Sequence, residues 1–556
     1  MLDARASCYA EVGCGMKREQ QHKSTVSGAL AISTSPPRWR PRFPASIGVV
    51  LSIATGLFAL FWLLDVAFFG ARTAAAKHAS AWHLLVDLDA ETLQNALGSL
   101  AQVVVAVLGI AITVVSIVVQ LASTRYTPRI AEMFFRDKKN LAIMGFFVVA
   151  CINAVWISVV VTSGFVPRAT VAMTTAMVTA SLLLLIPYFA YVFAFLDPVK
   201  VIASIGQQVL DAVLAQGTAK RDRDNLDQRQ TSCVAGLEHL SDIAVNMASQ
   251  KDKIIATGAI AALRDFAVKF IKEKTTVPEE WFVLGRRVRG NPDFIALAPH
   301  SLHALEQKKT WVEWKVLHHF RSVFSEALDH LPELAHVVAI ETRYIGEEAL
   351  RYGDREVIVL AIRYFNTFLR VALNRRDVRA CYNIFHQYRL LAETMMRKGH
   401  SDLVLEIGRC LAYYGRVAHQ GDLGFITETA AHDLGVLCER AFTNDVACHD
   451  SLLDIFLGLD KQAETQVEEQ TLRGIRKAQI KLAAFYLLKG ASRHVDRICA
   501  DMRSEKPERM ASIRAELVGV SEEQFWEVTD RGVNFDYLEP ARKERLDEFF
   551  ARASLR

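Results

Sequence analysis

The sequence predicts an all-α membrane protein with four transmembrane helices and a cytoplasmic α-helical, solenoid-like domain of the HEAT or TPR type. Two observations predict this fold. Between Thr92 and Asp197, three long stretches carry no charged residue, and each is about as long as the ~20 residues that a helix needs to cross a bilayer. After Tyr352, residues that end helices and residues that cap them recur at nearly regular intervals, which is typical of stacked helix pairs.

The chain is expected to have four parts. They are a disordered basic tail (1–45), a transmembrane domain (46–198), a helical cytoplasmic connector (199–350) and a helical repeat-like domain (351–556). The spans are placed at about 47–69, 97–123, 141–163 and 170–196. Each span should be an α-helix, because backbone N–H and C=O groups find no other partners in lipid.

The distribution of basic residues predicts the orientation in the membrane. One set lies in the tail and in the loop between the second and third spans: Lys17, Arg18, Lys23, Arg38, Arg40, Arg42, Arg125, Arg129, Arg136, Lys138 and Lys139. The opposite loops carry only Arg72, Lys77 and Arg168. Basic residues concentrate on the cytoplasmic side, so we expect both termini in the cytoplasm of a bacterial cell, with the spans in its inner membrane. The net charge of +4 gives no indication of a nucleic-acid partner.

The second span carries small and polar residues on one helical face, at spacings of three and four residues. They are Gln102, Ala106, Gly109, Thr113, Ser116 and Gln120. Such a face is typical of a helix-packing interface, either in the four-helix bundle or in a homo-oligomer, and we favour this interpretation. The alternative is that the face lines a pore. Spans two to four contain no acidic, basic or histidine residue in their interiors, which argues against a proton-coupled transporter.

A short amphipathic segment follows the second span. Tyr126, Pro128 and Arg129 form the predicted interfacial elbow, because proline suits the first turn of a helix. In the turns that follow, Ile130 and Phe134 lie on one side, as expected for a helix in the plane of the membrane interface.

At these residues the chain resembles a family of predicted bacterial multi-pass membrane proteins known only as a domain of unknown function. The resemblance rests on an aliphatic span followed by Gln120-Leu121-Ala122-Ser123-x-x-Tyr126-x-Pro128-Arg129, on the helix after it, and on Phe146. It covers about residues 95 to 200. It implies an inner-membrane protein with a cytoplasmic C-terminal region, and it implies no activity and no catalytic residues.

The turn signals after Tyr352 combine a helix-ending Gly or Asn with a capping Asp or Ser. They lie at Gly353-Asp354, Asn374 to Asp377, Gly399 to Asp402, Gly421-Asp422, Asn444-Asp445 and Gly490 to Ser492. Helix pairs of roughly 45 residues in such an arrangement mostly bind other proteins. The final aromatic segment, Phe525 to Leu538, either closes the end of the array or docks back on it, and we favour an end cap over a binding motif.

The sequence contains no catalytic or metal-binding signature that we can assign. His300 and His303, and likewise His318 and His319, lack a carboxylate or Cys at ligand spacing, and we place the second pair at a helix boundary. We therefore expect no enzyme, no cofactor and no metal. The favoured function is a membrane-anchored scaffold or sensor, homo-oligomeric in the bilayer, that binds cytoplasmic protein partners. The alternative is an oligomeric ion channel with span two lining the pore.

Overall fold

The computed structural model describes residues 90–554 apart from gaps at 126–128, 161–167, 215–222, 460–467, 504 and 526–528. Every regular element in these described ranges is an α-helix or a 3₁₀-helix. The chain divides into two compact units, with the division between Val201 and Ile202. We call the first the membrane unit and the second the helical array.

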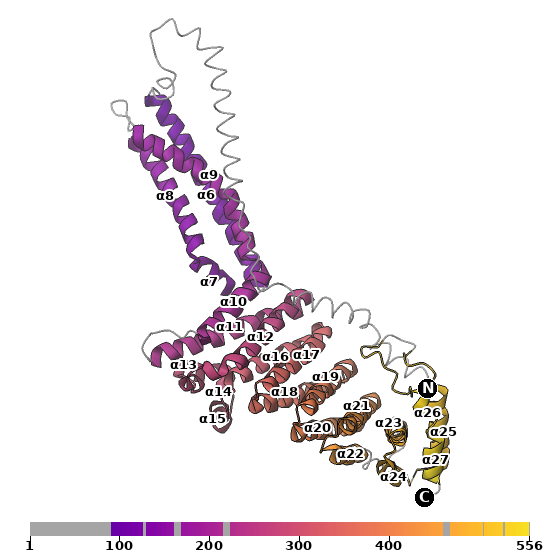
Figure 1. Ribbon diagram of the computed structural model, residues 1–556. Helices are drawn as coiled ribbons and strands as arrows, with labels where there is room; N and C mark the ends of the chain where they lie inside the picture. Colours follow the sequence, from indigo (N-terminus) through magenta and orange to yellow (C-terminus); the bar gives the residue numbers. More distant parts are fainter. Residues whose placement is uncertain are drawn as a thin grey trace. The chain divides into compact units, whose positions relative to one another are not determined.

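Within its described residues, the membrane unit contains three helices long and apolar enough to cross a bilayer (Figure 1). They are α6 (Ala90–Arg125), α8 (Lys138–Val160) and α9 (Arg168–Phe195), and the short helix α7 (Arg129–Arg136) lies between the first two. These candidate spans lie where the sequence predicts spans near 97–123, 141–163 and 170–196. The span predicted at 47–69 lies outside the described residues.

Small apolar side chains hold the three helices together. Val104 of α6, Ala150 of α8 and Val178 of α9 form one buried cluster. Leu97 of α6 and Ile157 of α8 belong to a second cluster. Small residues let helix backbones approach closely, and this packing contributes to association in lipid, where the hydrophobic effect does not.

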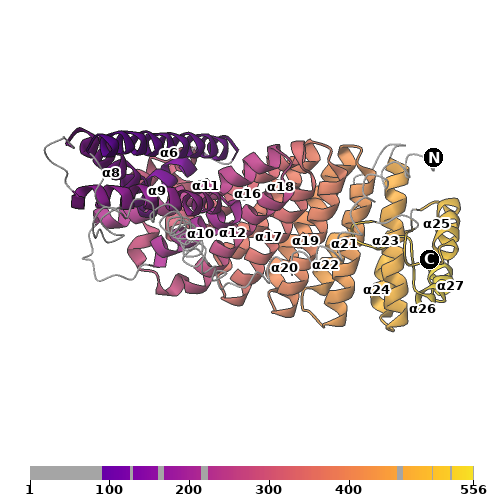
Figure 2. The same ribbon diagram turned by 90° about the horizontal axis from the view of Figure 1, so that it is seen from above.

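The helical array is a succession of helix pairs, as the solenoid-like prediction requires (Figure 2). It begins with α10 (Pro198–Leu214), whose first residues precede the division between the units. The pairs are α11 (Arg223–Ser249) with α12 (Lys253–Glu273), α16 (Trp311–His330) with α17 (Glu333–Arg351), α18 (Arg355–Asn374) with α19 (Val378–Arg397), α20 (Ser401–Gln420) with α21 (Gly424–Thr443), and α22 (His449–Leu457) with α23 (Glu468–Leu488). The first helices of successive pairs contact one another, and so do the second helices. The second helices α12, α17, α19, α21 and α23 thus form one continuous layer.

Two irregular regions complete the array. An insert between α12 and α16 contains η1 (Lys274–Thr276), η2 (Glu279–Phe282), α13 (Arg286–Arg289), α14 (Pro292–Ile295) and α15 (Pro299–Gln307). After α23 come α24 (Ser492–Asp501), α25 (Pro507–Gly519), α26 (Pro540–Lys543) and α27 (Leu546–Ser554). The last three pack against α23 at the end of the array.

The turns between helices lie where the sequence predicts them. Gly353 has φ 72° and Gly399 has φ 80°, the left-handed conformation that commonly follows a helix C-terminus. The next helix then begins two residues later, at Arg355 or at Ser401. Asp354 caps α18 by accepting a hydrogen bond from the backbone N–H of Val357, which satisfies one of the free donors of the first turn.

Candidate functional site

The polar face of the second span is exposed in the membrane unit. Its members Gln102, Ala106, Gly109, Thr113, Ser116 and Gln120 are all exposed. The opposite face is buried against α8 and α9, with Ala111 fully buried and Val115 nearly so. The polar face is therefore not the one that packs within the described three helices. Whether it packs on another span or on a second copy, or lines a pore, stays a prediction.

Several threonine hydroxyls in the membrane unit bond to their own helix. The Thr113 hydroxyl donates to the Gly109 carbonyl at 2.8 Å, and Thr175 and Thr179 make the same contact with the carbonyl four residues before. This arrangement satisfies the hydroxyl without a neighbouring helix.

The elbow falls partly outside the described residues. Tyr126 and Pro128 are not described, and helix α7 begins at Arg129. Later in α7, Phe134 is buried, and its ring centroid lies 5.3 Å from that of Phe195 on α9. Asn140 donates to the Phe134 carbonyl at 3.2 Å, so α7 is held to the start of α8.

Two tyrosines of α9 complete this junction. The Tyr188 hydroxyl donates to Asn140 Oδ1 at 2.9 Å, and the Tyr191 hydroxyl donates to Asp137 Oδ1 at 2.6 Å. Burial alone would raise the pKa of Asp137, but the bonds from Tyr191 and from the backbone N–H groups of Asn140 and Lys139 lower it. These partners were not predicted from the sequence. The polar Asp-Lys-Lys-Asn run at the start of α8 was the only local indication that polar contacts form at this position.

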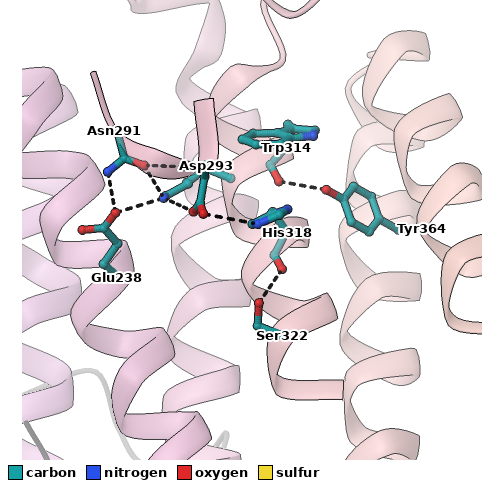
Figure 3. A network of polar contacts seen from close by, with 8 residues as sticks. Glu238, Asn291, Asp293, Trp314, His318, Ser322 and Tyr364 are labelled. Carbon is teal, nitrogen blue, oxygen red and sulfur yellow. Dashed lines mark hydrogen bonds and ion pairs between the residues drawn. The ribbon is translucent and has the colours of Figure 1, made fainter. Parts of the chain in front are cut away.

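In the array, one polar cluster surrounds the fully buried Lys315 of α16. Its ammonium lies 2.5 Å from the Asp293 carboxylate and 3.0 Å from that of Glu238. Asn291 donates to Glu238 at 2.7 Å, and a ring nitrogen of His318 lies 3.5 Å from Asp293 (Figure 3). A buried charge needs such compensation. The cluster fixes the insert, which provides Asn291 and Asp293, to α11 and α16.

The predicted helix-boundary position of His318 and His319 is wrong. Both lie inside α16, which continues from Trp311 to His330. The His318 ring stacks on Trp314 at 4.9 Å, and His319 is buried, which lowers its pKa to about 3 and keeps it neutral. An imidazole can lie on a buried helical face when it is neutral, so the His-His pair did not mark an end of the helix.

The candidate functional site is the surface of α19, α21 and α23 that holds an irregular segment of the same chain. We call this segment, Thr529 to Leu538, the strap. It lies outside regular secondary structure, and yet Thr529, Asp530 and Leu538 are buried. The side chains that contact it belong to three successive helices of the second-helix layer, and we call them the strap face. They are Arg379, Tyr382, Asn383, Phe425, His432, Asp433, Lys477 and Lys481.

Arg531 anchors the strap between α19 and α21. Its guanidinium lies 2.8 Å from the Asp433 carboxylate, and both side chains are almost completely buried. The same group donates to the Tyr382 carbonyl and lies over the Tyr382 ring, 4.2 Å from the centroid. Asp433 also accepts from Arg389 at 2.9 Å. Arg531 therefore combines an ion pair, a backbone contact and a cation–π contact in one buried position.

Phe535 is the second anchor. Its ring stacks on His432 with the centroids 4.1 Å apart, and it also stacks on Phe425 at 6.1 Å. Burial and the neighbouring cations hold the pKa of His432 well below its usual value, so the imidazole is a neutral aromatic surface here. Lys481 donates to the Phe535 carbonyl at 2.7 Å. Burial lowers the pKa of Lys481 to about 8.

Acidic strap residues face basic side chains on both sides of these anchors. Asp530 lies 3.2 Å from the Arg379 guanidinium and accepts from Asn383 at 3.0 Å. Asp536 lies 2.9 Å from the ammonium of Lys477. The strap face thus recognises an Asp-Arg pair, a spacer and a Phe-Asp pair. The aromatic density of the segment was visible in sequence, but its basic and acidic partners lie far away in the chain.

This placement corrects the favoured interpretation of the final segment as an end cap. The strap docks back across α19 and α21, and the helices that close the end are α25, α26 and α27. The physical reason is the distribution of partners: Asp433 and Tyr382 lie on helices before the end of the array. Trp526 to Val528, in the same predicted segment, lie outside the described residues.

Beyond the strap, the same layer continues onto α17 and α12. There Tyr344 lies between two guanidinium groups, with Arg343 4.5 Å and Arg264 5.8 Å from its ring centroid. Arg343 also bonds Gln387 of α19 at 2.8 Å, which connects this region to the strap face. None of the strap contacts described above involves α17 or α12.

Comparison with known proteins supports the prediction that this chain is a membrane protein. The sequence profile of a family described as "Predicted membrane protein (DUF2254)" matches residues 42–246, which confirms the resemblance drawn from the elbow motif. No curated protein matches the chain. Among solved structures, a circular tandem repeat protein with novel repeat topology and enhanced subunit contact surfaces is 14% identical, with a TM-score of 0.32, over 84% of this chain and 96% of that one.

Proposed function

We propose that this protein is a membrane-anchored scaffold whose helical array binds short irregular segments of partner proteins in the bacterial cytoplasm. The observation that carries the proposal is the strap. The array already holds a ten-residue stretch of irregular chain, from Thr529 to Leu538, through side chains of three successive helices. A surface built this way is suited to a second segment of similar chemistry.

The contacts of the strap define that chemistry. Arg531 and Phe535 are anchors of the kind that dominate protein interfaces, where arginine and aromatic side chains fill desolvated positions. The ion pairs of Asp530 and Asp536 fix the direction of the segment. The proposed partner therefore carries an arginine, a short spacer, and an aromatic residue followed by an acidic one, in a conformation with turns like those of the strap.

The strap occupies the strap face and therefore competes with this partner for it. A tethered segment has a high effective concentration, so a partner in solution binds only when it gains further contacts or when the strap leaves. The region around Tyr344 on α17 supplies such contacts, because its ring and Arg343 adjoin the strap face.

The experiment measures binding of a labelled peptide with the sequence of residues 529–538 to full-length protein in detergent by fluorescence anisotropy. Phe535→Ala and Arg531→Ala/Phe535→Ala proteins should bind the peptide, and wild-type protein should bind it at least about tenfold more weakly because its own strap competes. The matched control peptide has alanine in place of Arg531 and Phe535. Equal binding of both peptides, or no binding to a variant that retains its helical content and cooperative melting, would overturn the proposal.

A second candidate function, an oligomeric channel, is supported by the exposed polar face of α6. Gln102, Thr113 and Gln120 lie on the side that α8 and α9 leave open. Hydroxyl and amide groups of this kind can line a pore. Vesicles containing the purified protein should then pass ions, and Thr113→Leu should reduce the flux; Thr175→Leu on α9 is the control. Vesicles that pass no ions would remove this candidate.

A further inference from the structure

A second site lies near the far end of the array, on α22 and α24. His449 and Asp450 are the first two residues of α22, and His494 lies in the first turn of α24. Each of the three offers one ligand atom, and these atoms all lie within 4.8 Å of one another. None of them contacts the strap face or belongs to the candidate function above.

His449 is held as metal-ligating histidines usually are. Its Nε2 lies 2.6 Å from the hydroxyl of Tyr486, a fully buried residue of α23. This contact fixes the ring and leaves Nδ1 facing the cluster, where it lies 4.0 Å from Asp450 Oδ1. A histidine that binds a metal usually bonds a protein group through one ring nitrogen and the metal through the other. His449 has this arrangement, with Tyr486 as the bonded group and Nδ1 as the ligand atom.

His494 supplies an independent observation. Its Nε2 lies 3.1 Å from Asp450 Oδ1, but its Nδ1 is buried and has no hydrogen-bond partner among the described residues. A buried polar atom without a partner costs free energy, so it calls for an explanation. Phe442 packs edge-on against both imidazoles, 5.3 Å from His449 and 5.7 Å from His494. The rings are thus fixed on an apolar surface, while the side chain of Asp450 is about half exposed.

Two guanidinium groups lie near the carboxylate: Arg493 is 4.0 Å from Asp450 Oδ2, and Arg497 is the closer competing cation. Arg497 lies 2.8 Å from Asp450 Oδ1, and it also pairs with Asp454. Since Arg497 already has this second carboxylate, it can remain paired when Asp450 turns to another cation.

We propose that His449, Asp450 and His494 bind a divalent transition-metal ion, with Zn²⁺ as the ion that two imidazoles and one carboxylate best suit. His449 binds through Nδ1, His494 through a ring nitrogen and Asp450 through a carboxylate oxygen. Water completes the coordination on the exposed side, as it does in three-ligand zinc sites. The ion joins α22 to α24 and so stabilises the end of the array.

The test uses full-length protein without a histidine tag, dialysed against a chelator and titrated with Co²⁺, a spectroscopic substitute for Zn²⁺. The wild type should bind one ion per chain with visible d–d absorption, and Zn²⁺ should displace it. His449→Gln and His494→Ala should each weaken binding at least about tenfold, and Tyr486→Phe should weaken it by about tenfold through loss of the outer-shell contact. His303→Ala, at an exposed histidine, is the control and should bind as the wild type does.

Arg497→Gln separates a metal site from a purely structural ion pair. It removes the closer competing cation, so the proposal expects tighter Co²⁺ binding. Melting curves without metal establish that each variant is folded. Binding that is unchanged in both histidine variants, or weaker binding in folded Arg497→Gln protein, would overturn the proposal.

Discussion

The membrane unit and the helical array differ in where many of their polar side chains find partners. In the membrane unit, Thr113 bonds to the carbonyl one turn before it, within α6. In the array, the hydroxyl of Thr427 on α21 donates to the Gly415 carbonyl on α20, and Lys274 joins Glu313 to Asp354. A helix that faces lipid must satisfy its backbone groups within the helix. The array adds polar contacts between its helices, and these contacts define surfaces that can select a partner.

The largest expected effect is at the buried lysine of the array. Lys315→Met leaves the carboxylates of Asp293 and Glu238 without their cation, and we expect the free energy of unfolding to fall by about 3 kcal/mol. Lys308→Met, at an exposed pair with Glu356, is the matched control and should cost less than about 1 kcal/mol. Thermal melting of both variants, followed by tryptophan fluorescence, measures the difference. Equal melting temperatures would mean that the buried cluster does not stabilise the array.

The next effect is a pH-dependent contribution of Glu341 in the array. Burial raises the pKa of Glu341 to about 7, although Arg264 lies 3.1 Å away. Between the unfolded value near 4.5 and 7, the native state keeps a proton that the unfolded chain has lost. The contribution of Glu341 to the free energy of unfolding should therefore fall as pH rises from about 5 to 7.5, by on the order of 2 kcal/mol. Buried neutral histidines such as His319 contribute in the opposite direction, so the effect is measured as the difference between the wild type and a Glu341 variant.

Glu341→Gln should remove this contribution, so the stability of the wild type relative to the variant should decline over this pH range. The measurement compares melting temperatures of the wild type and the variant at several pH values across this range. Parallel curves for the two proteins would show that Glu341 titrates near its ordinary pKa and that Arg264 outweighs burial.

The smallest effect compares matched threonines in the two units. Thr427→Val breaks a bond between helices in the array and should cost about 1 kcal/mol. Thr113→Val removes a bond within α6 and should cost less than about 0.5 kcal/mol, because valine suits an apolar surrounding and the Gly109 carbonyl keeps its place in the helix. Melting of both variants in the same detergent measures the contrast. A larger loss for Thr113→Val would indicate that its hydroxyl meets another helix.

The sequence predicted those features that depend on local patterns. Uncharged runs of bilayer length placed α6, α8 and α9, and residues such as Gly353 and Asp354 placed the turns of the array. The sequence could not predict which face of α6 packs on α8 and α9, because a helix in lipid can pack on its neighbours through either an aliphatic or a polar face.

The candidate site was beyond sequence for a related reason. Arg531 pairs with Asp433, 98 residues earlier, and bonds the Tyr382 carbonyl, 149 residues earlier. Nothing in the local pattern around Arg531 selects these partners. The same holds for His449 and His494, which come together only because α22 and α24 pack on either side of Tyr486.

The central claim is that the strap face binds an irregular segment with an arginine and an aromatic anchor. The most direct measurement is the affinity of the 529–538 peptide for Arg531→Ala/Phe535→Ala protein, with and without Asp433→Asn on the strap face. The account predicts clear binding that Asp433→Asn weakens at least about tenfold, because the peptide's arginine loses its buried carboxylate. Binding that is equally strong with asparagine at this position would contradict it.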